Sequence, residues 1–138
     1  MNFRGYRRAN GTVGTRNHVL VLPTVICAVA VAEMISRTVP GTVAVSHPHG
    51  CGHMGAEKEH IIRTMSGFAA SPNAAGVLLV GLGCELITPG VIAEKLDKFG
   101  QRYEIISIQE AGGTLASVAK GKALAEKLLK EAAEARRE

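Results

Sequence analysis

An alternation of short apolar runs with longer segments of helical periodicity constrains the fold most strongly. Residues 18–22 form a nearly continuous apolar run that Pro23 closes, and residues 76–81 form a second run of the same kind. Such runs are typical of strands that are buried on both faces of a sheet. Two further strands are expected at 42–46 and 103–108. Helices are predicted at about 26–37, at 56–70, at 89–99 and from 114 to the C-terminus.

The resulting order, βαβαβαβα over residues 18–138, predicts one α/β domain with right-handed crossovers. We expect a three-layer, Rossmann- or flavodoxin-like fold with a mainly parallel four-stranded sheet, its strands in the order 2-1-3-4. Residues 1–17 are rich in Gly, Arg and Asn, and they predict an irregular basic arm that includes a short hairpin.

Two helices carry more detailed predictions. Thr24 is expected to be the N-cap of the first helix, and Cys27 is expected to be buried within it. For the last helix, the apolar spacing predicts an inward face formed by Leu115, Val118, Lys122, Ala125, Leu129 and Ala132, with Leu124 and Leu128 beside them.

The composition excludes several classes of protein. Hydrophobic residues make up 46% of the chain, which is enough for a core, and aromatic residues only 4%, which argues against stacking on single-stranded nucleic acid. The apolar runs are too short to span a bilayer, and no signal peptide is apparent. The three cysteines form no C-x-x-C pair, so we predict reduced thiols in a cytoplasmic protein, with no membrane or nucleic-acid partner.

A stretch from Ser46 to Gly55, the His/Cys loop, concentrates chemically active side chains. It holds His47, His49, Cys51 and His53 between a predicted strand and a predicted helix. Imidazoles, a thiol and flexible glycines are suited to a metal or catalytic site. The alternative is a surface turn. The loop also matches G-x-G-x-x-G, but no acidic residue ends the next strand, so a dinucleotide site is not predicted.

The ends of the other predicted strands add to this site. Cys84 and Glu85 follow the third strand, and Gln109 follows the fourth. Because parallel strands end at one edge of a sheet, we expect these side chains to lie near the His/Cys loop.

Four motifs together resemble the altronate and galactarate dehydratases, a family that includes the large subunit of sulfolactate sulfo-lyase. The motifs are Gly5-Tyr6-x-Arg8-x-x-Gly11-x-x-Gly14-Thr15-Arg16-Asn17, His47-x-x-Gly50-Cys51-Gly52, Gly81-Leu82-Gly83-Cys84-Glu85 and Ile108-Gln109-x-x-Gly112-Gly113-Thr114. The resemblance implies a hydro-lyase that removes water next to the carboxylate of a sugar acid, or a related reaction on a sulfo-acid, with the help of a divalent metal. Fe²⁺ is the first expectation, with Mn²⁺ and Zn²⁺ as alternatives.

The roles that we expect for individual residues follow from this resemblance and from the chemistry. His47, Cys51, Glu85 and Gln109 are the catalytic candidates. The predicted metal ligands are His47, Cys51 and Cys84, ahead of His49 and His53, which the family pattern does not require. Substrate binding is assigned to Arg16, Asn17, Gly112, Gly113 and Thr114.

The expected partners follow from the length of the chain. Family members continue well beyond 138 residues with a further C-terminal catalytic region. A C-terminal catalytic subunit is therefore the expected partner, and the chain is also a candidate homo-oligomer. The alternative is a non-catalytic subunit that binds an anionic ligand or regulates a partner.

Overall fold

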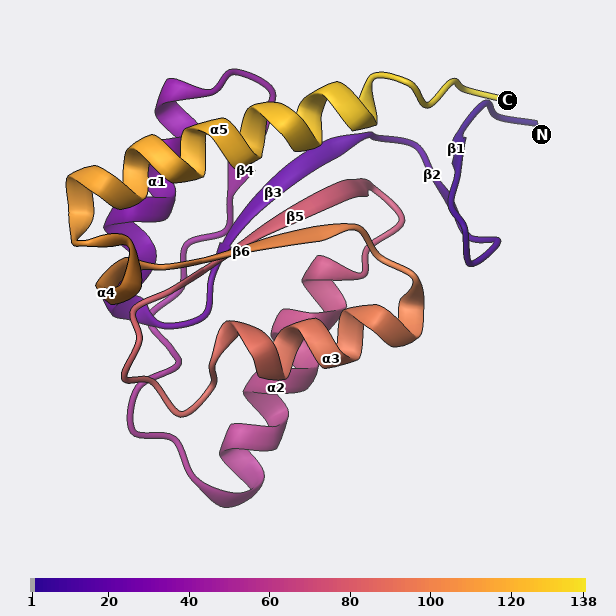
Figure 1. The fold of residues 1–138 in the computed structure, drawn as a ribbon. Coiled ribbons are helices and arrows are strands. Elements are labelled where there is room, and N and C mark those ends of the chain that lie inside the picture. Colours follow the sequence, from indigo (N-terminus) through magenta and orange to yellow (C-terminus); the bar gives the residue numbers. More distant parts are fainter. Residues whose placement is uncertain (1) are drawn as a thin grey trace.

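A four-stranded parallel sheet is the centre of the computed structural model, which describes residues 2–138. Its strands are β3 (His18–Pro23), β4 (Thr42–Ala44), β5 (Ala74–Gly81) and β6 (Tyr103–Ser107). They lie in the order β4-β3-β5-β6, all parallel, which confirms the predicted fold and strand order (Figure 1). Strand β4 at the sheet edge has only three residues, shorter than predicted, because the chain turns away into the His/Cys loop.

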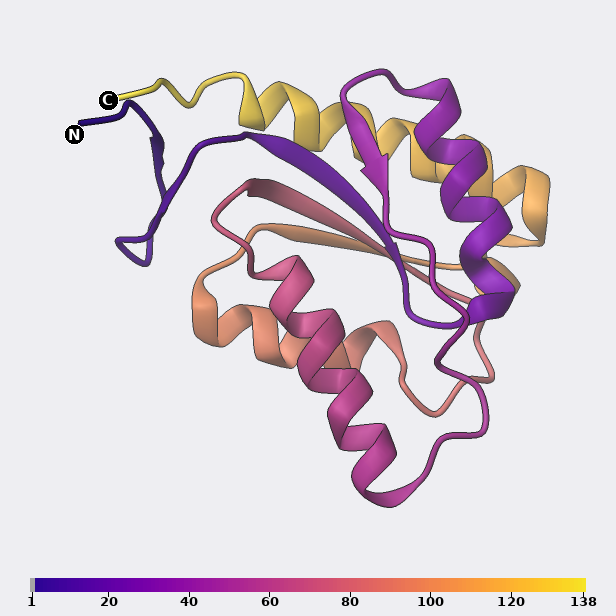
Figure 2. The same cartoon turned by 180° about the vertical axis from the view of Figure 1, so that it is seen from behind.

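Helices cover both faces of this sheet. The 3₁₀ helix η1 (Ile26–Ala28) leads into α1 (Val29–Thr38), which packs with α5 (Thr114–Ala132) on one face. Helices α2 (Gly55–Ala69) and α3 (Pro89–Phe99) cover the other face (Figures 1 and 2). The short helix α4 (Ile108–Ala111) follows β6, where the sequence predicts one more strand residue. No helix among residues 2–138 has the length and apolar character needed to cross a bilayer.

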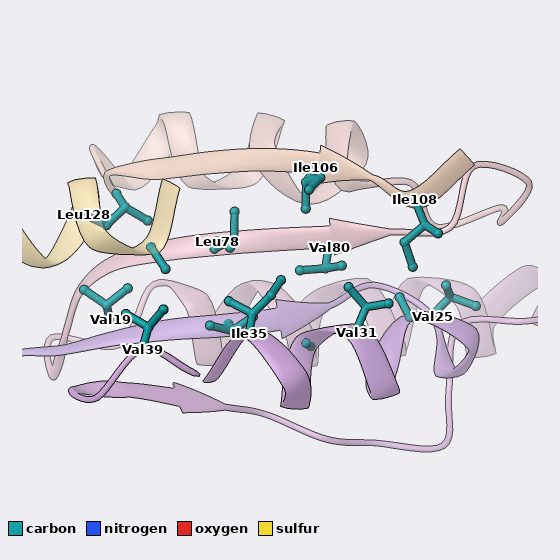
Figure 3. Close-up of a cluster of buried hydrophobic side chains, with 14 of the residues drawn as sticks. Val19, Val25, Val31, Ile35, Val39, Leu78, Val80, Ile106, Ile108 and Leu128 are labelled. Atoms are coloured by element: carbon teal, nitrogen blue, oxygen red, sulfur yellow. The ribbon is translucent and has the colours of Figure 1, made fainter. Parts of the chain in front are cut away.

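The two hydrophobic cores account for the continuous apolar runs. Along β5, Leu78 and Val80 face the core beneath α1 and α5 (Figure 3), while Val77 and Leu79 face the core beneath α2 and α3. All four side chains are fully buried. Successive residues of a strand point to opposite faces, so a strand that is covered on both sides needs apolar residues at every position.

The inward face of α5 agrees with the prediction only in part. Ala125 and Ala132 are buried as predicted, and Val118 and Leu129 pack against the same core. Leu115 is 80% exposed and Lys122 is exposed, whereas Ser117, Gly121 and Leu128 are buried. A Cβ atom on Gly121 would lie only 2.9 Å from Cγ1 of Ile35. Small residues thus let α5 approach α1 and the sheet closely, and this packing overrides the larger apolar side chains that set the predicted face.

Other local predictions had mixed outcomes. Gly100 ends α3 in the left-handed region with φ 63°, the C-terminal cap that glycine favours, and the start of α3 is capped by Thr88. Thr24 does not cap the first helix: Val25 is the residue before η1, and the Thr24 hydroxyl is used elsewhere. The last helix ends at Ala132 instead of continuing to the C-terminus.

The basic arm is folded against the end of the sheet where the strands begin. Strands β1 (Tyr6–Arg7) and β2 (Val13–Gly14) form the expected hairpin. Gly5 and Glu138 exchange two backbone hydrogen bonds of 3.1 and 2.9 Å, so the two ends of the chain lie side by side (Figures 1 and 2). Arg8 donates to the carbonyls of Pro72 and Arg16 and to the side chain of Asn17.

Candidate functional site

The opposite end of the sheet, which we call the strand-end edge, gathers three of the four sequence motifs. The His/Cys loop follows β4, the Gly81–Glu85 motif ends β5, and the Gln109 motif follows β6. The first two contact the segment Pro23–Ile26, which follows the central strand β3. The third reaches this segment through the loop after β5, because the N–H of Gln109 donates to the Leu82 carbonyl. This arrangement confirms that the predicted loops converge.

The ring of His47 is held at both nitrogens. Its Nε2 lies 2.6 Å from the carbonyl oxygen of Pro23, and its Nδ1 accepts a hydrogen bond of 3.2 Å from the backbone N–H of His49. A carbonyl only accepts hydrogen bonds, so this network requires the neutral ring with the proton on Nε2. Neither nitrogen then offers a free lone pair to a metal or to a substrate proton.

The His/Cys loop also docks on the Pro23–Ile26 segment through its backbone. Ile26 N–H donates to the carbonyl of His49 at 2.8 Å. Gly50 has a φ of +101°, and a Cβ atom there would overlap the Thr24 carbonyl and lie 2.7 Å from Cα of Val25. Only glycine permits this approach, both sterically and conformationally.

Glu85 is a buried hydrogen-bond acceptor, only 9% exposed. Its Oε1 accepts from the Thr24 hydroxyl at 3.1 Å and from the Leu82 N–H at 3.0 Å, and its Oε2 accepts from the Gly83 N–H at 2.6 Å. The carboxylate therefore joins the loop after β5 to the segment after β3. Thr24, which is fully buried, was missed as a site residue because its sequence position suits a helix cap equally well.

Gln109 is exposed and packs over the loop that carries Cys84. A Cβ atom on Gly83 would lie 3.0 Å from Cδ of Gln109, and the N–H of Gln109 donates to the Leu82 carbonyl at 3.0 Å. Gly112 and Gly113, with φ of 95° and 99°, then turn the chain into α5. No side chain caps this helix, so its first N–H groups, beginning at Thr114, have no side-chain acceptor at the strand-end edge.

His49 and His53 extend a row of imidazoles away from His47. The ring centroids of His47 and His49 are 6.1 Å apart, and those of His49 and His53 are 5.7 Å apart. Nδ1 of His53 lies 3.1 Å from the carboxylate of Glu57. Beside this row is a groove of about 440 Å³ between the β4 end and α2, with a mostly apolar lining that includes Leu22, Val45, Ile61, Met65 and Phe68.

All three cysteines are exposed. This corrects the prediction that Cys27 is buried, because Cys27 lies on the outer side of η1 and not within a buried helix. Cys51 and Cys84 are exposed on their loops, where a thiol can reach a reactant.

Arg16 and Asn17 are not brought to this edge. They precede β3, whereas Pro23 ends it, so about 20 Å of strand separates them from the His/Cys loop. Asn17 accepts from Arg8 at 2.8 Å and donates to the Ala132 carbonyl at 2.8 Å. The backbone N–H of Arg16 donates to Asn73 at 3.0 Å. These contacts fasten the arm to the body of the domain, and a substrate role for the two residues stays a prediction.

The predicted metal donors do not form a complete site within residues 2–138. No group of three or more His, Cys, Asp or Glu side chains in this range is placed to hold a metal ion. A stable transition-metal site requires three or four such ligands. The described residues of this chain therefore do not fit a resident metal by themselves.

Comparison with known proteins gives one family. The family model described as D-galactarate dehydratase/Altronate hydrolase, second domain, matches residues 5–133. The (2R)-sulfolactate sulfo-lyase subunit beta of Chromohalobacter salexigens is 37% identical over 110 residues, which are 80% of this chain and 28% of that protein.

Two altronate dehydratases are also similar. That of Bacillus subtilis is 38% identical over 93 residues, covering 60% of this chain and 19% of the relative, and that of Escherichia coli is 39% identical over 90 residues, covering 58% and 18%. The chain thus spans less than a third of the length of these relatives. No solved structure matches it.

Proposed function

The chain belongs to the D-galactarate dehydratase/altronate hydrolase second-domain family, and from that premise we propose that it is part of a lyase acting on a sugar acid. The proposed reaction removes water from an altronate- or galactarate-type acid and gives a 2-keto-3-deoxy acid. A sulfolactate-type acid, which loses its sulfonate group, is the second substrate class. The observation that supports this most is the family match over residues 5–133, combined with the convergence of three motifs at the strand-end edge.

The elimination requires two proton transfers. The C–H bond next to the carboxylate breaks, its electron pair forms the C=C bond of an enol, and the neighbouring hydroxyl leaves as water once it is protonated. The enol then becomes the keto acid by proton transfer. The exposed thiols of Cys51 and Cys84 are the side chains at this edge that we propose for proton transfer.

Binding of the acid is proposed for two groups beside these thiols. The side-chain amide of exposed Gln109 can donate to a hydroxyl or carboxylate of the substrate. The uncapped start of α5, from Thr114 onward, presents N–H groups and the positive end of a helix dipole, which favour a carboxylate, whereas the N–H of Gly113 already donates to the Ile108 carbonyl.

A further protein region is proposed to cover the strand-end edge. Charge that develops in the transition state is stabilised best where water is excluded, and this edge is open. Four large apolar side chains are exposed in the loops and helix starts there, namely Ile26, Met54, Leu86 and Leu115. The matched segments make up less than a third of each relative, so these relatives contain further sequence that can supply such a cover.

Dependence on Fe²⁺, Mn²⁺ or Zn²⁺ stays a prediction. Because residues 2–138 place no three donors together, such an ion needs ligands from the covering region. No step above uses it.

The test is an elimination assay on the purified chain, prepared without oxygen. Altronate, galactarate and sulfolactate are offered with each of the three metals, with and without the remaining part of the related altronate dehydratase as a separate polypeptide. We expect negligible turnover by the chain alone and release of a 2-keto-3-deoxy acid, or of sulfite, when the two are mixed. Cys51→Ser and Cys84→Ser are the matched variants, with Cys27→Ser as the control thiol.

Two outcomes would count against the proposal. Acid binding without elimination in every combination would favour the alternative, a subunit that only binds an anionic ligand. Elimination that is unchanged in both cysteine variants would remove the proposed role of the thiols.

A further inference from the structure

Two of the four residues that sequence patterns select as catalytic, His47 and Glu85, are already occupied by contacts within the chain. His47 uses both ring nitrogens, on the Pro23 carbonyl and the His49 N–H. Glu85 uses its carboxylate on the Thr24 hydroxyl and on two backbone N–H groups, those of Leu82 and Gly83. Both sets of contacts involve the Pro23–Ile26 segment.

We propose that His47 and Glu85 are positioning residues, which bind the two cysteine-bearing loops to the Pro23–Ile26 segment and so fix the thiols of Cys51 and Cys84. The reaction in which these thiols take part rests on the proposed function, whereas the positioning of the thiols does not. The contacts that support it belong to this chain alone.

The ring of His47 cannot become a metal ligand without breaking this arrangement. To bind a metal through Nε2, the ring must move its proton to Nδ1. The Nε2 lone pair would then lie 2.6 Å from the lone pairs of the Pro23 oxygen, and the Nδ1–H would face the His49 N–H. Both new pairings are repulsive, so metal binding or proton abstraction by His47 requires the loop to leave its dock.

Glu85 acts on its neighbour Cys84 through the backbone. Its Oε2 accepts the 2.6 Å hydrogen bond from Gly83, the residue directly before Cys84. Gly83 has a φ of +127°, a conformation that glycine adopts readily and other residues rarely do. With both carboxylate oxygens accepting hydrogen bonds and the side chain 9% exposed, the group is poorly placed to reach a substrate.

Thr24 links the two loops. Its hydroxyl donates to Glu85 at 3.1 Å, its N–H donates to the Val80 carbonyl at 2.9 Å, and its own carbonyl lies where a Cβ on Gly50 would fall. A single fully buried residue of the central connection thus contacts both the loop of Cys51 and the loop of Cys84.

Amide hydrogen exchange of the intact chain tests the contacts. In Glu85→Gln, an amide N–H₂ replaces one acceptor, and we expect Leu82 and Gly83 to exchange at least about tenfold faster. Thr24→Val is expected to accelerate the same amides severalfold, and Thr24→Ser, which keeps the hydroxyl, to restore the wild-type rates. Glu110→Gln changes an exposed glutamate on α4 and is the matched control. Unchanged exchange in Glu85→Gln would overturn the proposal for this residue.

Nitrogen NMR of the histidine rings tests His47 independently of activity. We expect the Nε2–H tautomer, with a slowly exchanging ring proton, and no change on addition of Zn²⁺ or, without oxygen, of Fe²⁺. A metal-induced shift of the His47 nitrogens, or metal binding that is lost in His47→Ala but kept in His49→Ala, would show that His47 is a ligand and that the proposal is wrong.

Thiol reactivity separates positioning from a role in stability alone. Rates of alkylation are followed at each cysteine by mass spectrometry. We expect His47→Ala to change the rate at Cys51 by severalfold and Thr24→Val to change the rate at Cys84, with Cys27 unaffected. A uniform change at all three thiols would indicate loss of stability and would refute positioning.

In the mixed assay, these variants should lower kcat more than they raise KM. If no mixture is active, the proposed function fails, whereas exchange, NMR and alkylation still decide this proposal.

Discussion

Replacement of Gly50 by alanine should detach the His/Cys loop from the Pro23–Ile26 segment. Gly50 has a φ of +101°, and its Cβ would overlap the Thr24 carbonyl and lie 2.7 Å from Cα of Val25. Both neighbours are backbone atoms of a connection that is buried and hydrogen-bonded, so neither can move aside at low cost. Gly52 provides a matched control, because it lies in the same loop with a φ of +75° and has nothing within 4 Å of its Cβ position.

The difference between the two variants gives the magnitude. A side chain in the left-handed region costs roughly 1–2 kcal/mol, and both variants share this cost. Gly50→Ala additionally breaks the Ile26–His49 and His47–Pro23 hydrogen bonds, each worth about 1 kcal/mol. We therefore expect Gly50→Ala to lower the free energy of unfolding by about 2 kcal/mol more than Gly52→Ala. For a chain of this size, that difference lowers Tm by about 7 °C.

Thermal unfolding and amide exchange check this prediction together. In Gly50→Ala the amides of Ile26 and His49 should lose protection while the amides of β5 keep theirs, since the loop can detach without unfolding the sheet. In Gly52→Ala both sets should stay protected. Equal Tm values for the two variants, with Ile26 still protected, would refute the docking of the loop at Gly50.

Three further predictions concern the fold. Gly121→Ala, whose Cβ would meet Ile35, should lower the free energy of unfolding in urea by about 1–3 kcal/mol. Gly67→Ala, on an open stretch of α2, should raise it by about 0.5–1 kcal/mol. A change of the same sign in both variants would contradict the close packing of α5. Leu78→Ala in the fully buried centre of β5 should cost about 2–5 kcal/mol in the same assay. Hydrogen bonds, first from Lys127 and then from Arg102, hold the pKa of Glu104 below 4.5. The ionised Glu104 therefore stabilises the fold above that pH, and this stabilisation is lost as the pH falls through the lowered pKa. Glu104→Gln should make the urea midpoint decline less steeply with acid, and an unaltered decline would show that Glu104 does not contribute to it.

The parts of the fold that follow from local pattern were predicted well. Residues 19–22 and 76–81 are apolar at every position, and a strand covered on both faces requires that pattern. The end of α3 at Gly100 follows for the same kind of reason, because a C-terminal cap depends on backbone geometry within a few residues.

The errors arise where distant segments decide the outcome. The buried face of α5 depends on how closely Ile35 of α1 approaches Gly121, which no periodicity within α5 reveals. Thr24 has the chemistry of a helix cap, but a carboxylate 61 residues away takes its hydroxyl. Likewise, the tautomer of His47 is set by the distant Pro23 carbonyl, which the spacing of His47 and Cys51 in the sequence does not reveal.

The first of the four family motifs has a physical explanation that needs no substrate. A Cβ on Gly14 would overlap the carbonyl of Pro72, and the Arg8 guanidinium donates to that same carbonyl at 2.7 Å. Arg8 also orients Asn17, which in turn binds the last turn of α5. These contacts join the hairpin, the turn before β5 and the end of α5 at the edge where the strands begin. The first motif therefore holds the chain together at the end of the sheet where the strands begin, while the other three motifs form the loops at the opposite end. Sequence similarity alone does not distinguish a structural role from a role in the site.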